Sequence, residues 1–224
     1  MTLLLLSITI LLLALLAYRA LQRALRADPF KKRFQNLYPP SKTVTWLSRQ
    51  GRRPLLAHLY QPADWHHTDK RPCIVLFFGG AWRVGSAWQF APFAARLCAL
   101  GAVVVLPEYR IKSRDRSTVE EAVVDGFTVI DKIRQSADCL GIDLARISVG
   151  GGSAGGHLAA WIATGRHPNG SHAADGFKPS SLLLFNPAVN FPIDASAYKG
   201  YSRRQKFSAR ALAKLSALDP MLHL

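Results

Sequence analysis

The sequence predicts an α/β fold built on a mostly parallel β-sheet, and three observations point to it. Continuous apolar runs at residues 73–78, 102–106 and 181–185 are typical of strands covered on both faces. Segments with helical spacing separate these runs, as expected of right-handed crossover units. Two β-like segments at 43–47 and 55–60 flank a turn, which predicts an antiparallel hairpin ahead of the parallel part.

The remaining elements follow in chain order. A helix is expected over 87–99, between the first two apolar runs. Ser117, Thr118, Val119 and Glu120 form a capping-box pattern, which predicts a helix from there to about residue 135. The apolar residues at three- and four-residue spacing that predict its buried face are Val119, Val123, Phe127, Ile130 and Ile133. A strand at 146–149 and a helix over 154–164 precede the last apolar run, with helices on both faces of the sheet.

Length and composition fit one globular domain over residues 43–224. Hydrophobic residues make up 49% of the 224 residues, and no repeat or low-complexity tract interrupts them. Cys73, Cys98 and Cys139 are far apart and lack CxxC spacing, so we interpret them as ordinary thiols; a disulfide or a metal site is the alternative. We expect neither a metal nor a cofactor.

The chain is strongly basic, with a formal net charge of +15. Residues 1–53 hold ten basic side chains against Asp28 alone, and a second basic group spans 199–214. No nucleic-acid-binding motif accompanies this charge, so a nucleic-acid partner is not expected. Basic residues beside an apolar segment more often mark a membrane surface or set the orientation of an anchor.

Residues 1–18 are predicted to be a membrane anchor or a signal segment. Residues 2–18 carry no charge, and seventeen residues of helix span roughly 25 Å, the lower limit for crossing a bilayer. Arginines follow the run and none precedes it, which favours a single-pass, uncleaved anchor over a signal peptide that would export the protein. A soluble amphipathic helix is a third reading. The positive-inside rule would place the body of the protein in the cytoplasm.

Residues 19–42 are predicted to link this segment to the domain. They are basic and contain Pro29, Pro39 and Pro40, which are typical of a connecting segment.

Gly151-Gly152-Ser153-Ala154-Gly155 matches the pattern G-x-S-x-G between a predicted strand and a predicted helix. The pattern is typical of a sharp turn that lifts a serine hydroxyl clear of the sheet, and small residues on either side let the turn close. The helix that follows directs its N-terminus at developing negative charge. We therefore predict that Ser153 is a nucleophile. A glycine-rich phosphate loop or a plain structural turn is the alternative.

A second loop, Phe77-Phe78-Gly79-Gly80-Ala81-Trp82, follows the first buried strand. With this loop, the segment Glu108-Tyr109-Arg110 and the stretch GIDLARISVGGGSAGGHLAAW, residues 43–224 resemble the hormone-sensitive-lipase-like and acetyl-esterase branch of the α/β-hydrolases. The resemblance implies an α/β-hydrolase fold with Ser153 as the nucleophile. It also implies an oxyanion hole formed by the N–H groups of Gly80, Ala81 and Ala154, and structural roles for residues 108–110 and His157.

The sequence departs from this family in its loop and at its C-terminal end. Phe78 stands where the family usually has a histidine, and Ala81 replaces a glycine, so the loop must be braced differently. The family places its catalytic acid and histidine after a further strand. We therefore expect the C-terminal strands to be missing, with Asp194, Asp219 and His223 as poorly placed substitutes for the acid and the base. The other histidines, His58, His66, His67, His167 and His172, are predicted to lie on the surface or in loops.

The function implied by the resemblance is hydrolysis of a small-molecule carboxylic ester with a short acyl chain. Two alternatives stay open: a catalytically impaired fragment, and a non-catalytic, membrane-anchored binding protein on the same scaffold. No substrate-binding residue can be assigned from the sequence.

Overall fold

The computed structural model describes residues 15–16, 28–48, 52–167, 177–189 and 220. The predicted anchor at 1–18 lies almost entirely outside the described residues, as does the basic group at 199–214. In the part of the chain that is described, no helix is both long and apolar enough to cross a membrane.

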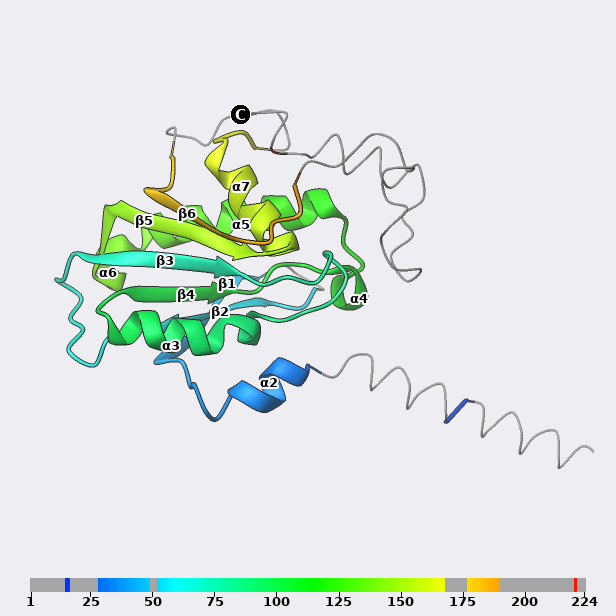
Figure 1. Cartoon of the computed structure of the whole chain (residues 1–224), viewed down its shortest axis with the longest axis horizontal. Coiled ribbons are helices and arrows are strands. Elements are labelled where there is room, and N and C mark those ends of the chain that lie inside the picture. Colours follow the sequence, from blue (N-terminus) through cyan, green and yellow to red (C-terminus); the bar gives the residue numbers. More distant parts are fainter. Residues whose placement is uncertain (1–14, 17–27, 49–51, 168–176, 190–219, 221–224) are drawn as a thin grey trace, which may run out of the picture.

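Six strands form one mixed sheet in the order β1-β2-β4-β3-β5-β6 (Figure 1). The strands are β1 (Lys42–Leu47), β2 (Leu55–Tyr60), β3 (Arg71–Phe77), β4 (Val103–Pro107), β5 (Ile142–Gly152) and β6 (Ser181–Phe185). β1 pairs antiparallel with β2, and β2 pairs antiparallel with β4. The pairs β4–β3, β3–β5 and β5–β6 are parallel. The predicted hairpin and parallel sheet are therefore confirmed.

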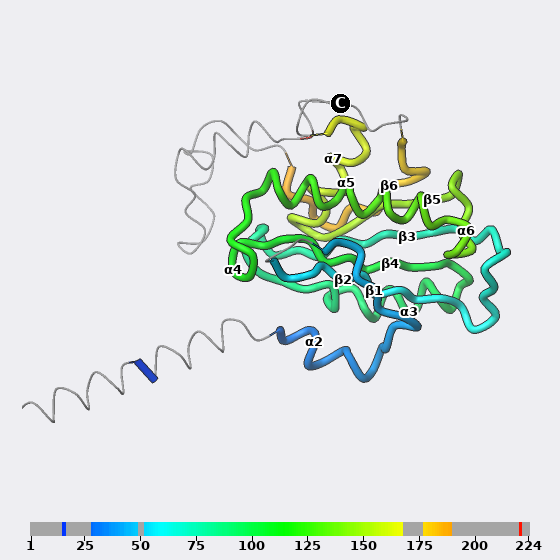
Figure 2. The backbone as a smooth tube through the Cα atoms, turned by 180° about the vertical axis from the view of Figure 1, so that it is seen from behind, coloured from blue at the N-terminus to red at the C-terminus, as the bar shows by residue number. Residues whose placement is uncertain are grey.

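Helices cover both faces of the sheet, as the right-handed crossover rule requires. The short 3₁₀-helix η1 (Ala87–Phe90) and α3 (Ala91–Ala99) connect β3 to β4 on one face. α5 (Val119–Gln135), α6 (Ala137–Leu140) and α7 (Ala154–Ala163) follow on the way to β5 and β6. α3 lies in front of the sheet in Figure 1, and α5 lies in front when the molecule is seen from behind in Figure 2. α7 packs against α5 and over β5 and β6.

The core lies between these layers, and the central strands are the most deeply buried. Val103, Val104, Val105 and Leu106 of β4 are each at most 1% exposed, as expected for a parallel strand covered on both faces. All three cysteines are free thiols: Cys73 is buried, Cys98 is partly buried and Cys139 is exposed. Burial raises the pKa of the Cys73 thiol to about 12.

A short helix precedes the sheet. The interval 19–42, expected to be a connecting segment, contains the helix α2 (Pro29–Phe34). Asp28 caps this helix because its side chain accepts a hydrogen bond from the Lys31 N–H at 2.9 Å, and Pro29 occupies the first helical position. Phe30 and Phe34 pack against the core, so the helix α2 is attached to the domain.

The capping box of α5 begins one residue later than predicted. Thr118 is the N-cap, and its hydroxyl accepts from the Glu121 N–H while the Glu121 carboxylate accepts from the Thr118 N–H. The short helix α4 (Lys112–Asp115) lies just before it. The predicted buried face of α5 is confirmed for Val123, Phe127, Ile130 and Ile133, whereas Val119 is only partly buried.

His58 was predicted to lie on the surface or in a loop, and this is wrong. It lies in the middle of β2, is 4% exposed, and its ring is 4.6 Å from the ring of Trp88. Its Nδ1 is 3.0 Å from the Thr43 hydroxyl on the neighbouring strand. Burial lowers the pKa of His58 below its usual value.

Candidate active site

Ser153 lies at the turn between β5 and α7, where the sequence predicts a nucleophile. Its backbone has φ 49° and ψ −114°, a conformation that non-glycine residues rarely adopt. The Ser153 N–H donates to the Phe185 carbonyl at 3.0 Å, and the Ser153 carbonyl accepts from the N–H groups of His157 and Ala188. These bonds hold the serine in its strained turn.

The glycines on either side of the serine are required because a side chain at either position would clash with the backbone. A Cβ added to Gly155 would lie 2.1 Å from the Phe77 carbonyl oxygen, and one added to Gly151 would lie 2.4 Å from the same atom. The end of β3 therefore passes directly against the turn, and a larger residue at either position would force the two apart. The G-x-S-x-G spacing thus corresponds to a contact between β3, β5 and α7.

The loop after β3 lies against this turn. A Cβ on Gly79 would be 2.9 Å from the Gly152 carbonyl oxygen, so the loop approaches the residue before Ser153 backbone to backbone. Gly80, Ala81 and Trp82 all have positive φ, at 136°, 52° and 55°. The Gly80 carbonyl closes the loop by accepting from the N–H groups at positions 83 and 84.

The predicted oxyanion donors lie in these two segments. Gly80 and Ala81 belong to the loop, and Ala154 is the first residue of α7, whose N-terminal N–H groups carry partial positive charge. Within the part of the chain that the structure describes, no protein acceptor occupies these three N–H groups. They are therefore available to an anionic oxygen.

Gln89 braces the loop, and sequence reasoning missed it. Its side-chain Oε1 accepts a hydrogen bond from the Gly79 N–H at 2.7 Å. Gln89 lies in η1, ten residues after Gly79, and no motif singles it out. Gln89 and Tyr109 both contact this loop, in which Phe78 stands where the resembling family has a histidine.

Tyr109 supports the loop through its hydroxyl group and its ring. Its hydroxyl donates to the Phe78 carbonyl at 2.7 Å, and its ring stacks on that of Phe78 with centroids 4.1 Å apart. Tyr109 is fully buried, and burial raises the pKa of its hydroxyl, which stays protonated and remains a donor.

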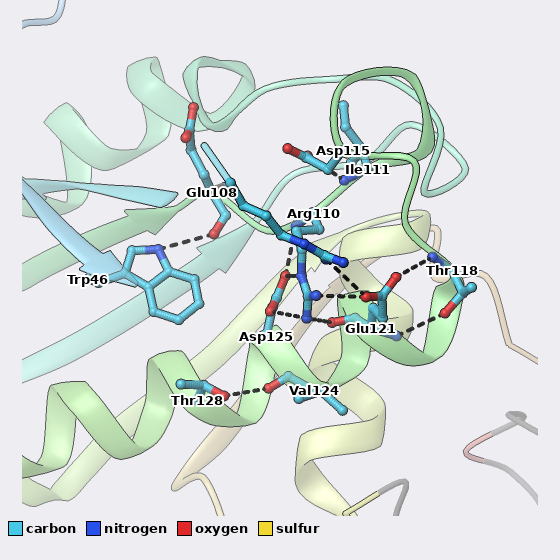
Figure 3. Close-up of polar contacts among 11 residues, drawn as sticks. Trp46, Glu108, Arg110, Ile111, Asp115, Thr118, Glu121, Val124, Asp125 and Thr128 are labelled. Atoms are coloured by element: carbon cyan, nitrogen blue, oxygen red, sulfur yellow. Dashed lines mark hydrogen bonds and ion pairs between the residues drawn. The ribbon is translucent and has the colours of Figure 1, made fainter. Parts of the chain in front are cut away.

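An ion-pair network anchors the chain on either side of Tyr109 (Figure 3). The Arg110 guanidinium donates to both oxygens of Asp125, at 2.8 and 2.7 Å, and to Glu121 at 2.8 Å. Asp125 is fully buried and Arg110 is 4% exposed. Both charges are satisfied, whereas removal of one partner from such a pair typically costs about 3–5 kcal/mol. The Glu108 carbonyl also accepts from the Trp46 indole at 3.1 Å. The structural role expected for residues 108–110 is confirmed.

His157 is fully buried one turn after Ser153, and its ring meets the Trp82 ring edge-on at 5.0 Å. It therefore packs the loop against α7, in line with its expected structural role. Asp194, Asp219, His172 and His223 lie outside the described residues.

Cavities of two sizes lie in the described part of the chain. One of about 310 Å³ borders Gly79 and Gly80 of the loop. A larger one of about 530 Å³ lies between β1, β2 and the C-terminal half of α5, and its lining includes none of the predicted site residues. Of these two cavities, the smaller one adjoins the loop that holds the predicted oxyanion donors.

Comparisons with known proteins agree with this geometry. Residues 74–223 match the family model described as alpha/beta hydrolase fold. An AB hydrolase superfamily protein of Schizosaccharomyces pombe is 33% identical over 132 residues, which cover 58% of this chain and 37% of that protein. The carboxylesterase NlhH of Mycobacterium tuberculosis is 33% identical over 97 residues, which cover 42% of this chain and 30% of that protein. The chain thus spans about a third of the length of these curated relatives.

Solved structures of esterase 2 from Thermogutta terrifontis superpose on the chain. The native enzyme is 32% identical with a TM-score of 0.68, covering 83% of this chain and 66% of that one. The butyrate-bound form is 31% identical with a TM-score of 0.67, covering 83% and 68%. A form phosphorylated by paraoxon is 31% identical with a TM-score of 0.65, covering 83% and 66%. From the family match, the sheet order and the strained serine turn, we conclude that the chain belongs to the α/β-hydrolase fold family.

Proposed function

We propose that the protein hydrolyses carboxylic esters of small molecules with Ser153 as the nucleophile. The observation that carries the proposal is the strained backbone of Ser153, held between β5 and α7, with the loop that contains the Gly80 and Ala81 N–H groups against it. Membership of a family that includes a carboxylesterase, and similarity to a bacterial esterase, support the same reaction.

The proposed reaction has two steps. Ser153 Oγ attacks the acyl carbon, and the N–H groups of Gly80, Ala81 and Ala154 stabilise the negative charge that develops on the carbonyl oxygen. The C–O bond to the alcohol breaks, and the alcohol leaves with a proton. Water then attacks the acyl carbon of the acyl-enzyme and the bond to Oγ breaks; the water's OH becomes part of the released carboxylic acid, and its other proton goes to Ser153 Oγ. We assign no acid or base, because the described residues place neither against Ser153 Oγ.

An aromatic cluster beside the turn supports a short acyl chain as the substrate's acyl group. The rings of Phe90, Phe93 and Phe185 contact one another at centroid distances between 5.6 and 6.1 Å. The Phe185 carbonyl accepts a hydrogen bond from the Ser153 N–H, so this aromatic cluster lies beside the proposed nucleophile. The similar esterase has been solved with butyrate and with propionate, which supports short acyl groups for this chain.

The nucleophile is tested by covalent labelling of the full chain. A fluorophosphonate probe should label Ser153, and Ser153→Ala should abolish both labelling and hydrolysis of p-nitrophenyl butyrate. Ser180→Ala, an exposed serine outside the turn, is the matched control and should label as the wild type does. Labelling that survives in Ser153→Ala would assign the nucleophile to another residue.

We also propose that residues 1–18 anchor the protein in a membrane as a single-pass segment. The uncharged run at 2–18 and the arginines that follow it support this. The full chain should sediment with membranes and resist carbonate extraction, whereas a chain that starts at Pro40 should not. Recovery of the unprocessed full chain in the soluble fraction would refute the anchor.

A further inference from the structure

The cavity beside the loop has both an apolar wall and a charged group. Its apolar lining comes from Pro29 and Phe30 of α2, from Val84 and from Ile111. Its polar lining comes from the loop glycines and the side chains of Asp28, Gln89, Ser113 and Arg114. At about 310 Å³ it has the size of a small organic ligand rather than that of a single ion.

Arg114 is the unusual member of this lining. Its Nε and Nη2 are buried, and among the described residues neither has a hydrogen-bond partner. A guanidinium carries five N–H donors, and buried donors are normally satisfied because each unpaired one costs free energy. Burial lowers the pKa of Arg114 for the same reason, since the charged form has lost its hydration. Arg114 also lines the cavity, and the described residues supply no acceptor to these two nitrogens.

The carboxylates near Arg114 are engaged elsewhere. Glu108 and Asp115 both pair with Arg53. Asp28 caps α2 through its contact with the Lys31 N–H. These charges act on Arg114 only at a distance, so its guanidinium contrasts with that of Arg110, whose nitrogens bind Asp125 and Glu121 directly.

We propose that this cavity binds an organic carboxylate on the guanidinium of Arg114, with the apolar stem of the ligand against Phe30, Val84 and Ile111. A guanidinium matches the geometry of a carboxylate. A single negative charge fits better than a phosphate dianion, because Asp28 already contributes a negative charge to the same wall.

The carboxylate has two chemical sources. Because the cavity shares Gly79 and Gly80 with the loop, it could be the far end of a half-ester whose ester carbonyl lies at Ser153, and this source rests on the proposed function. It could equally be a free carboxylic acid, which binds whether or not the protein is an esterase.

Binding is tested first, without reference to activity. Calorimetric titration of the full chain should detect hexanoate and show at least about tenfold weaker binding of hexanol, the uncharged analogue. Arg114→Met should weaken hexanoate binding at least about tenfold. Lys112→Met, which removes an exposed positive charge two residues away and outside the lining, should leave it unchanged.

A second variant keeps the test decisive if Arg114→Met fails to fold. Ser113 is exposed and lines the cavity, so Ser113→Glu should weaken hexanoate binding by repulsion while Arg114 stays in place. The proposal is overturned if hexanoate does not bind, if hexanol binds equally well, or if neither lining variant changes the affinity.

Kinetics then separate the two sources. We compare the mono-p-nitrophenyl ester of adipic acid with p-nitrophenyl hexanoate, a neutral ester of the same length. If the substrate supplies the carboxylate, Arg114→Met should lower kcat/KM at least about tenfold for the adipate ester alone. If only hexanoate binding depends on Arg114, the ligand is a free acid. If neither ester is hydrolysed, the proposed function fails while the titration still decides the carboxylate site.

Discussion

Gly155 offers the sharpest test of the serine turn, through the substitution Gly155→Ala. The added methyl group would meet the Phe77 carbonyl oxygen at 2.1 Å, its carbon at 2.5 Å and the Phe78 carbonyl oxygen at 2.5 Å. All three are backbone atoms at the end of β3, so no side chain can move aside. Normal contact requires β3 and α7 to separate by roughly an ångström. Small-to-large changes in a packed core cost about 1–3 kcal/mol, and backbone clashes of this kind belong at the upper end.

The matched control is Gly126→Ala on α5. Its methyl group would meet the Ile162 Cδ1 at 3.3 Å, the tip of a flexible side chain. Alanine in a helix interior is also favoured over glycine by about 1 kcal/mol, so this variant should keep or raise the stability.

Thermal unfolding measures both variants. A loss of about 3 kcal/mol corresponds to a fall in Tm of about 6–12 °C for a domain of this size. Gly155→Ala should show this fall and label with fluorophosphonate about a hundredfold more slowly, since an ångström of misplacement at a reacting group costs about that factor. If Gly155→Ala unfolds at the wild-type temperature and labels normally, the contact between β3 and α7 is not what fixes the turn.

Three further predictions follow from single side chains. Gln89→Leu removes the acceptor for the Gly79 N–H and should slow labelling of Ser153, whereas Gln89→Glu keeps an acceptor and should restore it; equal rates would exclude the brace. Burial lowers the pKa of His58, so its contribution to stability is fully present above about pH 6.5 and is lost as the pH falls below that value. Chemical denaturation should show this loss in wild type and in His67→Phe, an exposed control, but not in His58→Phe. Leu184 in β6 is 40% exposed, so Leu184→Lys should reduce self-association in light scattering, and unchanged association would contradict this.

The sheet and the two loops at its centre could be predicted because local patterns determine them. Runs of buried β-branched residues mark β3 and β4, and the glycines beside Ser153 are required by contacts that recur wherever such a turn forms. Gly79 and Gly80 follow the same logic, because a Cβ at either position would meet backbone at under 3 Å.

The features that could not be predicted depend on partners far away in the sequence. Residues 117–121 contain two hydroxyls and two glutamates, so two capping-box registers are possible. Glu121 is selected because Arg110 also binds it, which local pattern cannot reveal. His58 is a polar residue of a type usually found on the surface. The ring of Trp88, thirty residues later in the sequence, nevertheless packs against it. The importance of Gln89 and Arg114 becomes visible only when the loop and α2 are placed beside them.

The position of β3 beside β5 has a consequence for how the protein could change. In the sheet, the connection after β3 runs toward β4 on one face, and the connection after β5 runs toward β6 on the other. The two connections therefore leave in opposite directions along the sheet. Such topological switch points have a crevice at the carboxyl ends of the strands. The two walls of that crevice belong to separate crossover units. The exposed side chains of Arg83 and Val84 can therefore change in polarity while the serine turn, fixed by β3 and α7, stays as it is.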